Sequence, residues 1–136
     1  MKMSKEEELQ KKVIQFQLLE SNFRIFQERA EIINERVEEM QKTRLALEEM
    51  DVKKATSALI PLGSGNFVFG KIDDSDNVIV GIGGGIAMKK NKKEAIEILN
   101  SKIKEYEKNM NNLSEQSGKI FLQLQKLQSE IEKLQE

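Results

Sequence analysis

The sequence predicts an α+β fold, in which two short β-hairpins join the two helices of a long antiparallel coiled coil. Apolar residues recur every seven positions towards both ends of the chain. Seven of the eight glycines lie between Gly63 and Gly85, and the single proline, Pro61, lies beside them. We therefore divide the chain into an N-terminal coiled-coil helix (1–54), a four-stranded double hairpin (55–90) and a C-terminal coiled-coil helix (91–136).

The first helix carries two lanes of residues that repeat every seven positions. Ten of the twelve positions in these lanes are apolar, and only Lys12 and Arg44 are charged. This repeat is typical of a coiled-coil seam, over a helix of roughly 65 to 70 Å. The seam positions are Leu9, Lys12, Phe16, Leu19, Phe23, Phe26, Ala30, Ile33, Val37, Met40, Arg44 and Leu47.

The middle of the chain changes to β-branched residues and turn residues. Strands are predicted at 56–60, 66–72, 78–82 and 86–90, with turns at 61–65, 73–77 and 83–85. Several strand residues are apolar on both faces, and about 35 residues cannot bury both faces alone. We therefore expect neighbouring chains to cover the oligomerisation residues Phe67, Val68, Phe69, Ile72, Val78, Ile79, Val80 and Ile82.

The second helix repeats the two-lane pattern, with Ser117 as its one polar seam position. An antiparallel register in which paired residue numbers sum to 143 sets Leu9 against Leu134 and Leu47 against Ile96. Pairing of the two helices between different chains gives a similar pattern and stays open. The seam positions are Ile96, Leu99, Ile103, Tyr106, Met110, Leu113, Ser117, Ile120, Leu124, Leu127, Ile131 and Leu134.

Composition argues against an enzyme, a cofactor and a metal site, because the chain has neither Cys nor His. The 22 Lys and Arg against 23 Asp and Glu give no basic field for nucleic acid or an anionic membrane. With no apolar run long enough to span a bilayer and no signal-like N-terminus, a cytoplasmic protein is expected.

Two glycine motifs are interpreted as hairpin turns. GNFVFGKI at 65–72 has the glycine spacing of a P-loop, but Ile72 replaces the required Ser or Thr, and Asp73 and Asp74 would repel phosphate. In GIGGGI at 81–86, Ile86 stands where a dinucleotide-binding loop needs its third glycine. Neither motif therefore predicts a nucleotide site.

The central motifs resemble the α-type subunits of archaeal prefoldin. The resemblance rests on ALIPLGSGNFVFGKI at 58–72, DNVIVGIGGGIAMKK at 76–90 and EAIEIL at 94–99. It implies a chaperone hexamer of two α-type and four β-type subunits, in which the hairpins assemble into an oligomeric β-barrel platform. It also implies that the coiled-coil tips hold unfolded client proteins without ATP and deliver them to a group II chaperonin. A coiled-coil structural tether or spacer is the alternative function.

Apolar residues outside the seam lanes are candidates for client binding. Most of them lie in the half of the coil farthest along the sequence from the hairpins, and Ile98 is the exception. We interpret Ile25 and Ile32 as widening the seam. Fraying of the last turns would also expose seam residues. The predicted client-binding residues are Leu9, Val13, Ile14, Phe16, Leu18, Phe121, Leu122, Leu127, Ile131 and Leu134.

Overall fold

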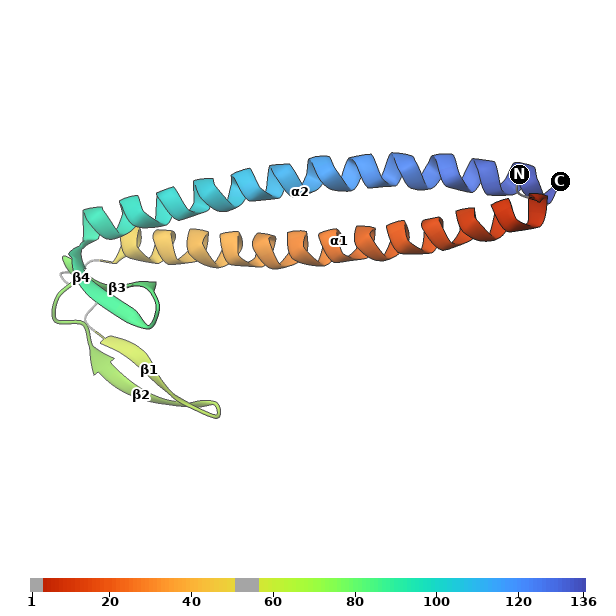
Figure 1. The fold of residues 1–136 in the computed structure, drawn as a ribbon. Coiled ribbons are helices and arrows are strands. Elements are labelled where there is room, and N and C mark those ends of the chain that lie inside the picture. Colours follow the sequence, from red (N-terminus) through yellow and green to blue (C-terminus); the bar gives the residue numbers. More distant parts are fainter. Residues whose placement is uncertain (1–3, 51–56) are drawn as a thin grey trace. The chain divides into compact units, whose positions relative to one another are not determined.

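The computed structural model describes residues 4–50 and 57–136, and in these it contains two long helices and two β-hairpins (Figure 1). The elements run in the order α1 (Lys5–Glu49), β1 (Ser57–Gly63), β2 (Asn66–Lys71), β3 (Asn77–Gly83), β4 (Ile86–Asn91) and α2 (Lys92–Gln135). The predicted α+β class is confirmed. The chain divides into unit 1 (Met1–Val37 with Glu105–Glu136) and unit 2 (Glu38–Lys104), and each is described by itself.

Both helices begin with a side-chain cap. Ser4 precedes α1, and its Oγ accepts a hydrogen bond from the Glu7 amide at 3.2 Å. Asn91 precedes α2: its Oδ1 accepts from the Glu94 amide at 2.7 Å, and its Nδ2 donates to Glu94 Oε1 at 3.1 Å. Asn91 is thus an N-cap residue that satisfies one backbone donor of the first turn, and its second bond holds the Glu94 side chain against the cap. It sets the point at which the β segment ends and α2 starts.

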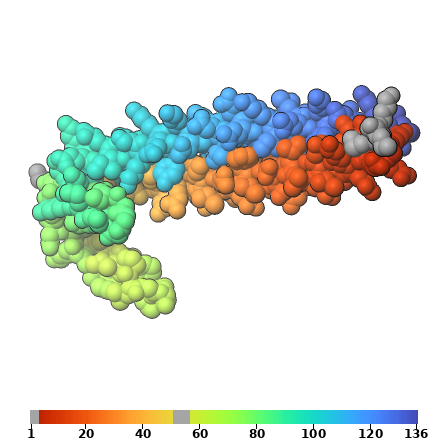
Figure 2. All heavy atoms as spheres, in the orientation of Figure 1, coloured from red at the N-terminus to blue at the C-terminus, as the bar shows by residue number. Residues whose placement is uncertain are grey.

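In unit 1, α1 and α2 run antiparallel, and their seam positions face one another. Lys5 Nζ donates to the Glu136 main-chain oxygen at 3.0 Å, so the described ends of the two helices are adjacent. The Lys12–Glu130 ion pair and the contact between the tilted rings of Phe23 and Phe121 join residues whose numbers sum to 142 and 144, on either side of the predicted 143. Figure 2 shows the side chains of the two helices meeting along this unit.

Burial follows the predicted seam in both units. Every predicted seam position is buried or partly buried, including the polar Lys12, Arg44 and Ser117. The most deeply buried members are Leu47, Ile103 and Leu124, each less than a tenth exposed. A stripe this narrow gives a two-helix contact and leaves the other helix faces open to solvent.

In unit 2, the second hairpin packs on the start of α2. A small cavity of about 180 Å³ is lined by residues of β3, including Val78 and Val80, and by Leu47, Ala95 and Ile98 of the helices. Lys102 Nζ donates to the Gly81 carbonyl at 3.2 Å, and the Lys92 amide donates to the Asp76 carbonyl at 2.8 Å. These contacts cover one face of β3.

Each hairpin is a separate two-stranded antiparallel sheet. β1 pairs with β2 from Ser57 opposite Lys71 to Gly63 opposite Asn66. The predicted turn at 61–65 was too long, because β1 continues through Pro61, which lies opposite Phe67. Proline lacks an amide hydrogen, so it is tolerated in an edge strand such as this one. Thr56, the predicted first residue of the strand, lies outside the described residues.

The glycine motifs form turns. Gly63 and Gly65 flank Ser64 at the first turn with φ of 112° and 80°, and Gly83, Gly84 and Gly85 all have positive φ at the second. L-residues with a side chain rarely adopt this conformation, which explains why glycine is found here. The Asn66–Lys71 part of GNFVFGKI is strand β2, so no helix follows Lys71 as a P-loop requires.

Truncating a buried seam residue should destabilise the coil far more than truncating an exposed leucine two positions away. Leu124 is 9% exposed and Leu122 is 66% exposed. We expect Leu124→Ala to lower the free energy of unfolding by about 2 to 5 kcal/mol, and Leu122→Ala by no more than about 0.5 kcal/mol. Thermal and urea unfolding followed by circular dichroism measures both. Equal losses would show that the seam has been misplaced.

Candidate functional site

The described part of unit 1 exposes large apolar side chains close to the helix ends. Ile14 is 57% exposed, Leu18 63%, Phe121 48% and Leu122 66%. None of these four lies in a seam lane, so pairing of the two helices leaves them largely uncovered, although the Phe121 ring contacts Phe23. Exposed apolar side chains gathered on one segment are typical of a surface that binds another molecule. These four predicted client-binding residues are therefore accessible in the folded chain.

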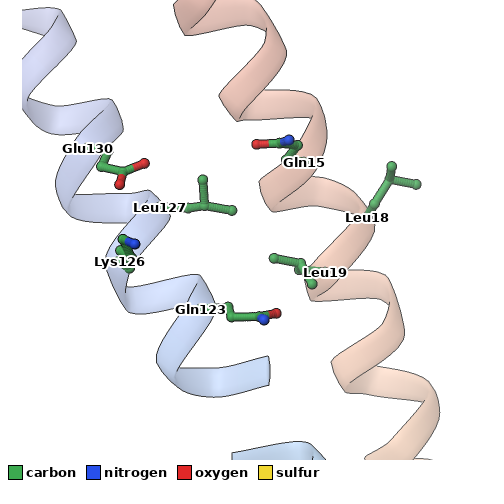
Figure 3. Close-up of a pocket in the computed structure, with 7 residues that line it drawn as sticks. All are labelled: Gln15, Leu18, Leu19, Gln123, Lys126, Leu127 and Glu130. Atoms are coloured by element: carbon green, nitrogen blue, oxygen red, sulfur yellow. The ribbon is translucent and has the colours of Figure 1, made fainter. Parts of the chain in front are cut away.

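An open groove of about 430 Å³ runs beside the seam (Figure 3). Figure 3 shows Leu19 and Leu127 pointing towards one another from facing helices, while Leu18 points away from α2. The rim is polar: Gln15 and Gln123 are amides, and Lys126 and Glu130 carry one charge of each sign. The groove therefore combines an apolar floor with hydrogen-bonding groups of low net charge.

A second groove of about 490 Å³ lies on the other side of the seam. Its apolar lining is Val13, Phe16 and Ile131. Its polar lining consists of three amides and two carboxyl side chains: Gln17, Gln128, Gln135, Glu20 and Glu132. The two grooves share no lining residue. An amide side chain both donates and accepts hydrogen bonds, so these rims can meet the backbone of an extended polypeptide whatever its sequence. The apolar floors can take its hydrophobic side chains.

A partly buried ion pair interrupts the apolar seam near the Lys5 end of α1. Lys12 Nζ donates to Glu130 Oε2 at 2.6 Å, and the two side chains are 22% and 32% exposed. This hydrogen bond lowers the pKa of the Glu130 carboxyl below its ordinary value of 4.5, and the positive charges of Lys12, Lys126 and Lys133 act in the same direction against the effect of burial. Lys12, the charged residue in the seam, therefore has an oppositely charged partner, and their hydrogen bond favours the carboxylate form of Glu130.

The remaining predicted client-binding residues are less accessible. Val13 is partly buried, as are the five seam residues Leu9, Phe16, Leu127, Ile131 and Leu134. In the folded chain they line grooves or close the seam. Whether fraying exposes these seam residues stays a prediction.

Four other positions differ from the sequence interpretation. Ile25 and Ile32 are 42% and 54% exposed, so the prediction that they widen the seam was wrong. They follow Leu18 at intervals of seven on a helix face next to the seam, which α2 does not reach. Ile98 is not surplus, because it lines the cavity beneath β3. Leu45 was missed: it is 52% exposed, and only its place outside the lanes could have indicated this.

The hairpins expose a second apolar surface. Among the predicted oligomerisation residues, Phe67, Phe69, Ile79 and Ile82 are exposed, Phe69 to 84%. Val68 is 38% exposed, whereas Ile72, Val78 and Val80 are partly buried within the chain. Sequence reasoning missed several neighbours, because only paired strands show which residues share a surface. These exposed neighbours are Leu59, Ile60, Leu62, Ile86 and Met88.

Other kinds of site are not found in the described residues. Across residues 4–50 and 57–136, no group of three or more acidic, His or Cys side chains is placed to hold a metal ion. Neither of the two described helices is both long and apolar enough to cross a lipid bilayer.

Comparison with known proteins relates this chain to the prefoldin subunit family. The model of the prefoldin subunit family matches residues 19–136. Prefoldin subunit alpha of Pyrococcus horikoshii is 33% identical over 74% of this chain and 69% of its own length. Prefoldin subunit alpha of Archaeoglobus fulgidus is 29% identical over 95% of each chain. The cryo-EM structure of filamentous PFD from Methanocaldococcus jannaschii has the same fold, with a TM-score of 0.67, 18% identity, and coverage of 89% of this chain and 98% of that one.

The Lys12–Glu130 pair predicts a pH dependence of coil stability. A carboxyl with a lowered pKa in the folded state adds stability above its unfolded pKa of 4.5, and this stability is lost as the pH falls through the lower folded pKa. Between about pH 6 and about pH 3, the melting temperature should therefore fall more for the wild type than for Glu130→Gln. Glu132→Gln, two residues away, is the control and should keep the wild-type fall. An unchanged fall in Glu130→Gln would contradict the assignment.

Proposed function

Because this chain belongs to the prefoldin family, we propose that it is a chaperone subunit that holds unfolded polypeptide at the terminal ends of its two helices, without nucleotide. The observation that carries the proposal is the coincidence, in one part of unit 1, of exposed off-seam apolar residues and two amide-rimmed grooves. Unfolded chains share exposed apolar side chains and unpaired backbone amides. The apolar residues of this surface can contact the former, and its amide side chains can hydrogen-bond to the latter.

The same surface explains weak, unselective binding. Each groove is open and offers only a few apolar side chains, so one coil holds a client segment briefly. Several coils acting on one client would raise the overall affinity through effective concentration, while each contact still breaks quickly. Fast release is what delivery of the client to a group II chaperonin requires. No step in this cycle needs a nucleotide.

We also propose that the hairpins are the assembly surface. β1–β2 and β3–β4 are separate two-stranded sheets with exposed apolar residues, and such ribbons are marginal on their own in water. Strands from neighbouring subunits would pair with their open edges and cover Phe69 and Ile79. The assembly proposed is a cytoplasmic hexamer with β-type subunits, two α-type to four β-type, built on a β-barrel platform.

A coiled-coil tether or spacer is the weaker candidate. A spacer needs only the seam and the hairpins, so its exposed tip residues should tolerate polar replacement. It gives no reason for Ile14, Leu18 and Leu122 to be apolar and more than half exposed. Polar substitution of these residues therefore separates the two functions.

Polar substitutions at the tip should abolish protection of a client without unfolding the chain. We expect Ile14→Gln with Leu18→Gln to raise the concentration needed to suppress aggregation of a denatured protein at least about tenfold. Burial of one such side chain contributes roughly 1.5 to 3 kcal/mol, and about 1.4 kcal/mol is a factor of ten. Light scattering measures the suppression, and circular dichroism checks that the melting temperature is kept.

The matched control is Leu45→Gln, which replaces a leucine of similar exposure in the unit 2 part of α1. It should protect the client as the wild type does. A chain lacking residues 1–18 and 121–136 should still assemble but should lose protection. If both assembly and protection survive that deletion, the tip assignment is wrong.

A charge on the exposed face of the first hairpin should prevent assembly. Phe69 is 84% exposed in the single chain, so Phe69→Asp leaves the isolated subunit folded but would bury a carboxylate in the proposed barrel. Native mass spectrometry with and without a β-type partner should show only smaller species for this variant. Ser57→Asp, an exposed polar position on the same hairpin, is the control and should assemble normally. Normal assembly of Phe69→Asp would refute the hairpin interface.

A further inference from the structure

Another apolar surface, separate from that of the hairpins, runs along α1 in unit 1, beside the client-binding grooves. Leu18, Ile25 and Ile32 lie seven residues apart on one helix face and are 63%, 42% and 54% exposed. Lys11 and Glu39 occupy the same heptad position before and after them. We call these three apolar residues the lateral stripe. It extends for roughly 21 Å along the helix, at about 1.5 Å per residue.

Opposite charges line the two sides of the lateral stripe. Glu28 and Glu35 lie three or four residues from the stripe positions on one side, and Arg29 and Arg36 lie on the other. Within the described residues, the ion pairs of the chain use other side chains: Lys12–Glu130, Arg24–Glu20 and Arg44–Glu48. The guanidinium of Arg29 lies 5.7 Å from the centre of the ring of Phe26, a seam residue on the basic side of the stripe. The lateral stripe therefore has an acidic and a basic edge.

We propose that the lateral stripe docks against the lateral stripe of a second copy of this chain, with the two α1 helices parallel and in register. In a parallel pair related by a two-fold axis, the acidic edge of one helix faces the basic edge of the other. In an antiparallel pair, like edges meet, so Glu would face Glu and Arg would face Arg. Charge complementarity therefore selects the parallel arrangement, which brings Glu28 beside Arg29 and Glu35 beside Arg36 of the second copy.

The spacing of the lateral stripe fits a helix better than an extended client segment. Stripe positions are separated by about 10.5 Å along the helix, and a parallel helix repeats at the same distance. An extended chain rises about 3.3 Å per residue, so it would reach the next position after about three residues, when its side chains point to the opposite side. Leu18 also lines a groove, whereas Ile25 and Ile32 line neither.

The contact is too small to hold two free subunits together. Three side chains from each copy bury far less than the roughly 1,200 to 2,000 Å² of a stable interface. The inference therefore rests on the proposed function, in which assembly places two copies in one complex and raises their local concentration. The contact would then draw two coils side by side. It would set how far apart their client-binding ends stand.

Single cysteines test this contact directly, because the chain has none of its own. Ile32→Cys places a thiol in the lateral stripe, and Gln27→Cys places one at an exposed position on the opposite side of the same helix. In the assembled oligomer under mild oxidant, we expect Ile32→Cys to form the covalent dimer several-fold faster than Gln27→Cys. A disulfide needs the two Cα atoms within roughly 4.4 to 6.8 Å of each other, which stripe-to-stripe packing provides.

The same cross-linking assay also tests the orientation of the two α1 helices and the role of the charges beside the lateral stripe. A tagged Leu18→Cys chain mixed with an untagged Ile32→Cys chain should give no mixed dimer above the Gln27→Cys rate, because those positions meet only in an antiparallel pair. Adding Glu35→Arg to Ile32→Cys should slow the cross-link by bringing two arginines together, and adding Arg36→Glu as well should restore it. Salt at about 1 M should also slow it, because the Debye length falls to about 3 Å.

Equal rates for Ile32→Cys and Gln27→Cys, or a dominant mixed dimer, would overturn the lateral contact. An oligomer whose mass shows one copy of this chain would overturn it as well. The proposed function is judged separately, by suppression of client aggregation with the reduced Ile32→Cys oligomer. Full protection with no cross-link would refute the lateral contact and leave the chaperone function supported. The Ile14 and Leu18 variants test the chaperone function alone and do not bear on the lateral contact.

Discussion

The structure depends on a seam only two residues wide. Each helix buries two heptad lanes and leaves the rest of its surface in water, so the chain has almost no globular core. An apolar residue outside those lanes is therefore covered only where it lies at the edge of the seam, as Val13 does, or beneath a hairpin, as Ile98 does under β3. Apart from Leu45, the large apolar side chains that remain exposed in the described residues lie on the tips, the lateral stripe and the hairpins. These are the surfaces for which function must account.

The two charged breaks in the seam are paired, which explains how the helices keep one register. Lys12 has Glu130 in unit 1, and Arg44 donates to the Asn100 side chain at 2.8 Å in unit 2. A shift of the helices by one heptad that moves Lys12 from Glu130 to Gln123 would move Arg44 from Asn100 to Lys93, so both charges would lose their partners. Partly buried polar pairs of this kind add little net stability and mainly penalise wrong alignments. The seam thus specifies a pairing as well as a fold.

Sequence periodicity was enough for the helices, because heptads constrain the position of every seam residue. The two lanes named each buried or partly buried seam position, even Lys12, Arg44 and Ser117. Periodicity failed where the exposure of a residue depends on a neighbouring segment, because the heptad pattern carries no information about that segment. Ile25 and Ile32 each lie next to a seam position, and the heptad pattern does not show whether such a neighbour is covered by the facing helix. They were therefore assigned to the seam, and Leu45 was overlooked for the same reason. In the hairpins, Pro61 indicated a turn, since the sequence does not show that its edge is unpaired.

In this structure α1 and α2 of one chain pair with each other, and not with helices of another chain. Spin labels on cysteines at Lys11 and Lys133 test this, in doubly labelled chains diluted with unlabelled chains. Because paired helix axes lie about 8 to 10 Å apart, we expect a single label separation of about 20 to 30 Å that dilution does not change. A longer separation, or a short one that disappears on dilution, would show that the helices pair between chains and would contradict the account.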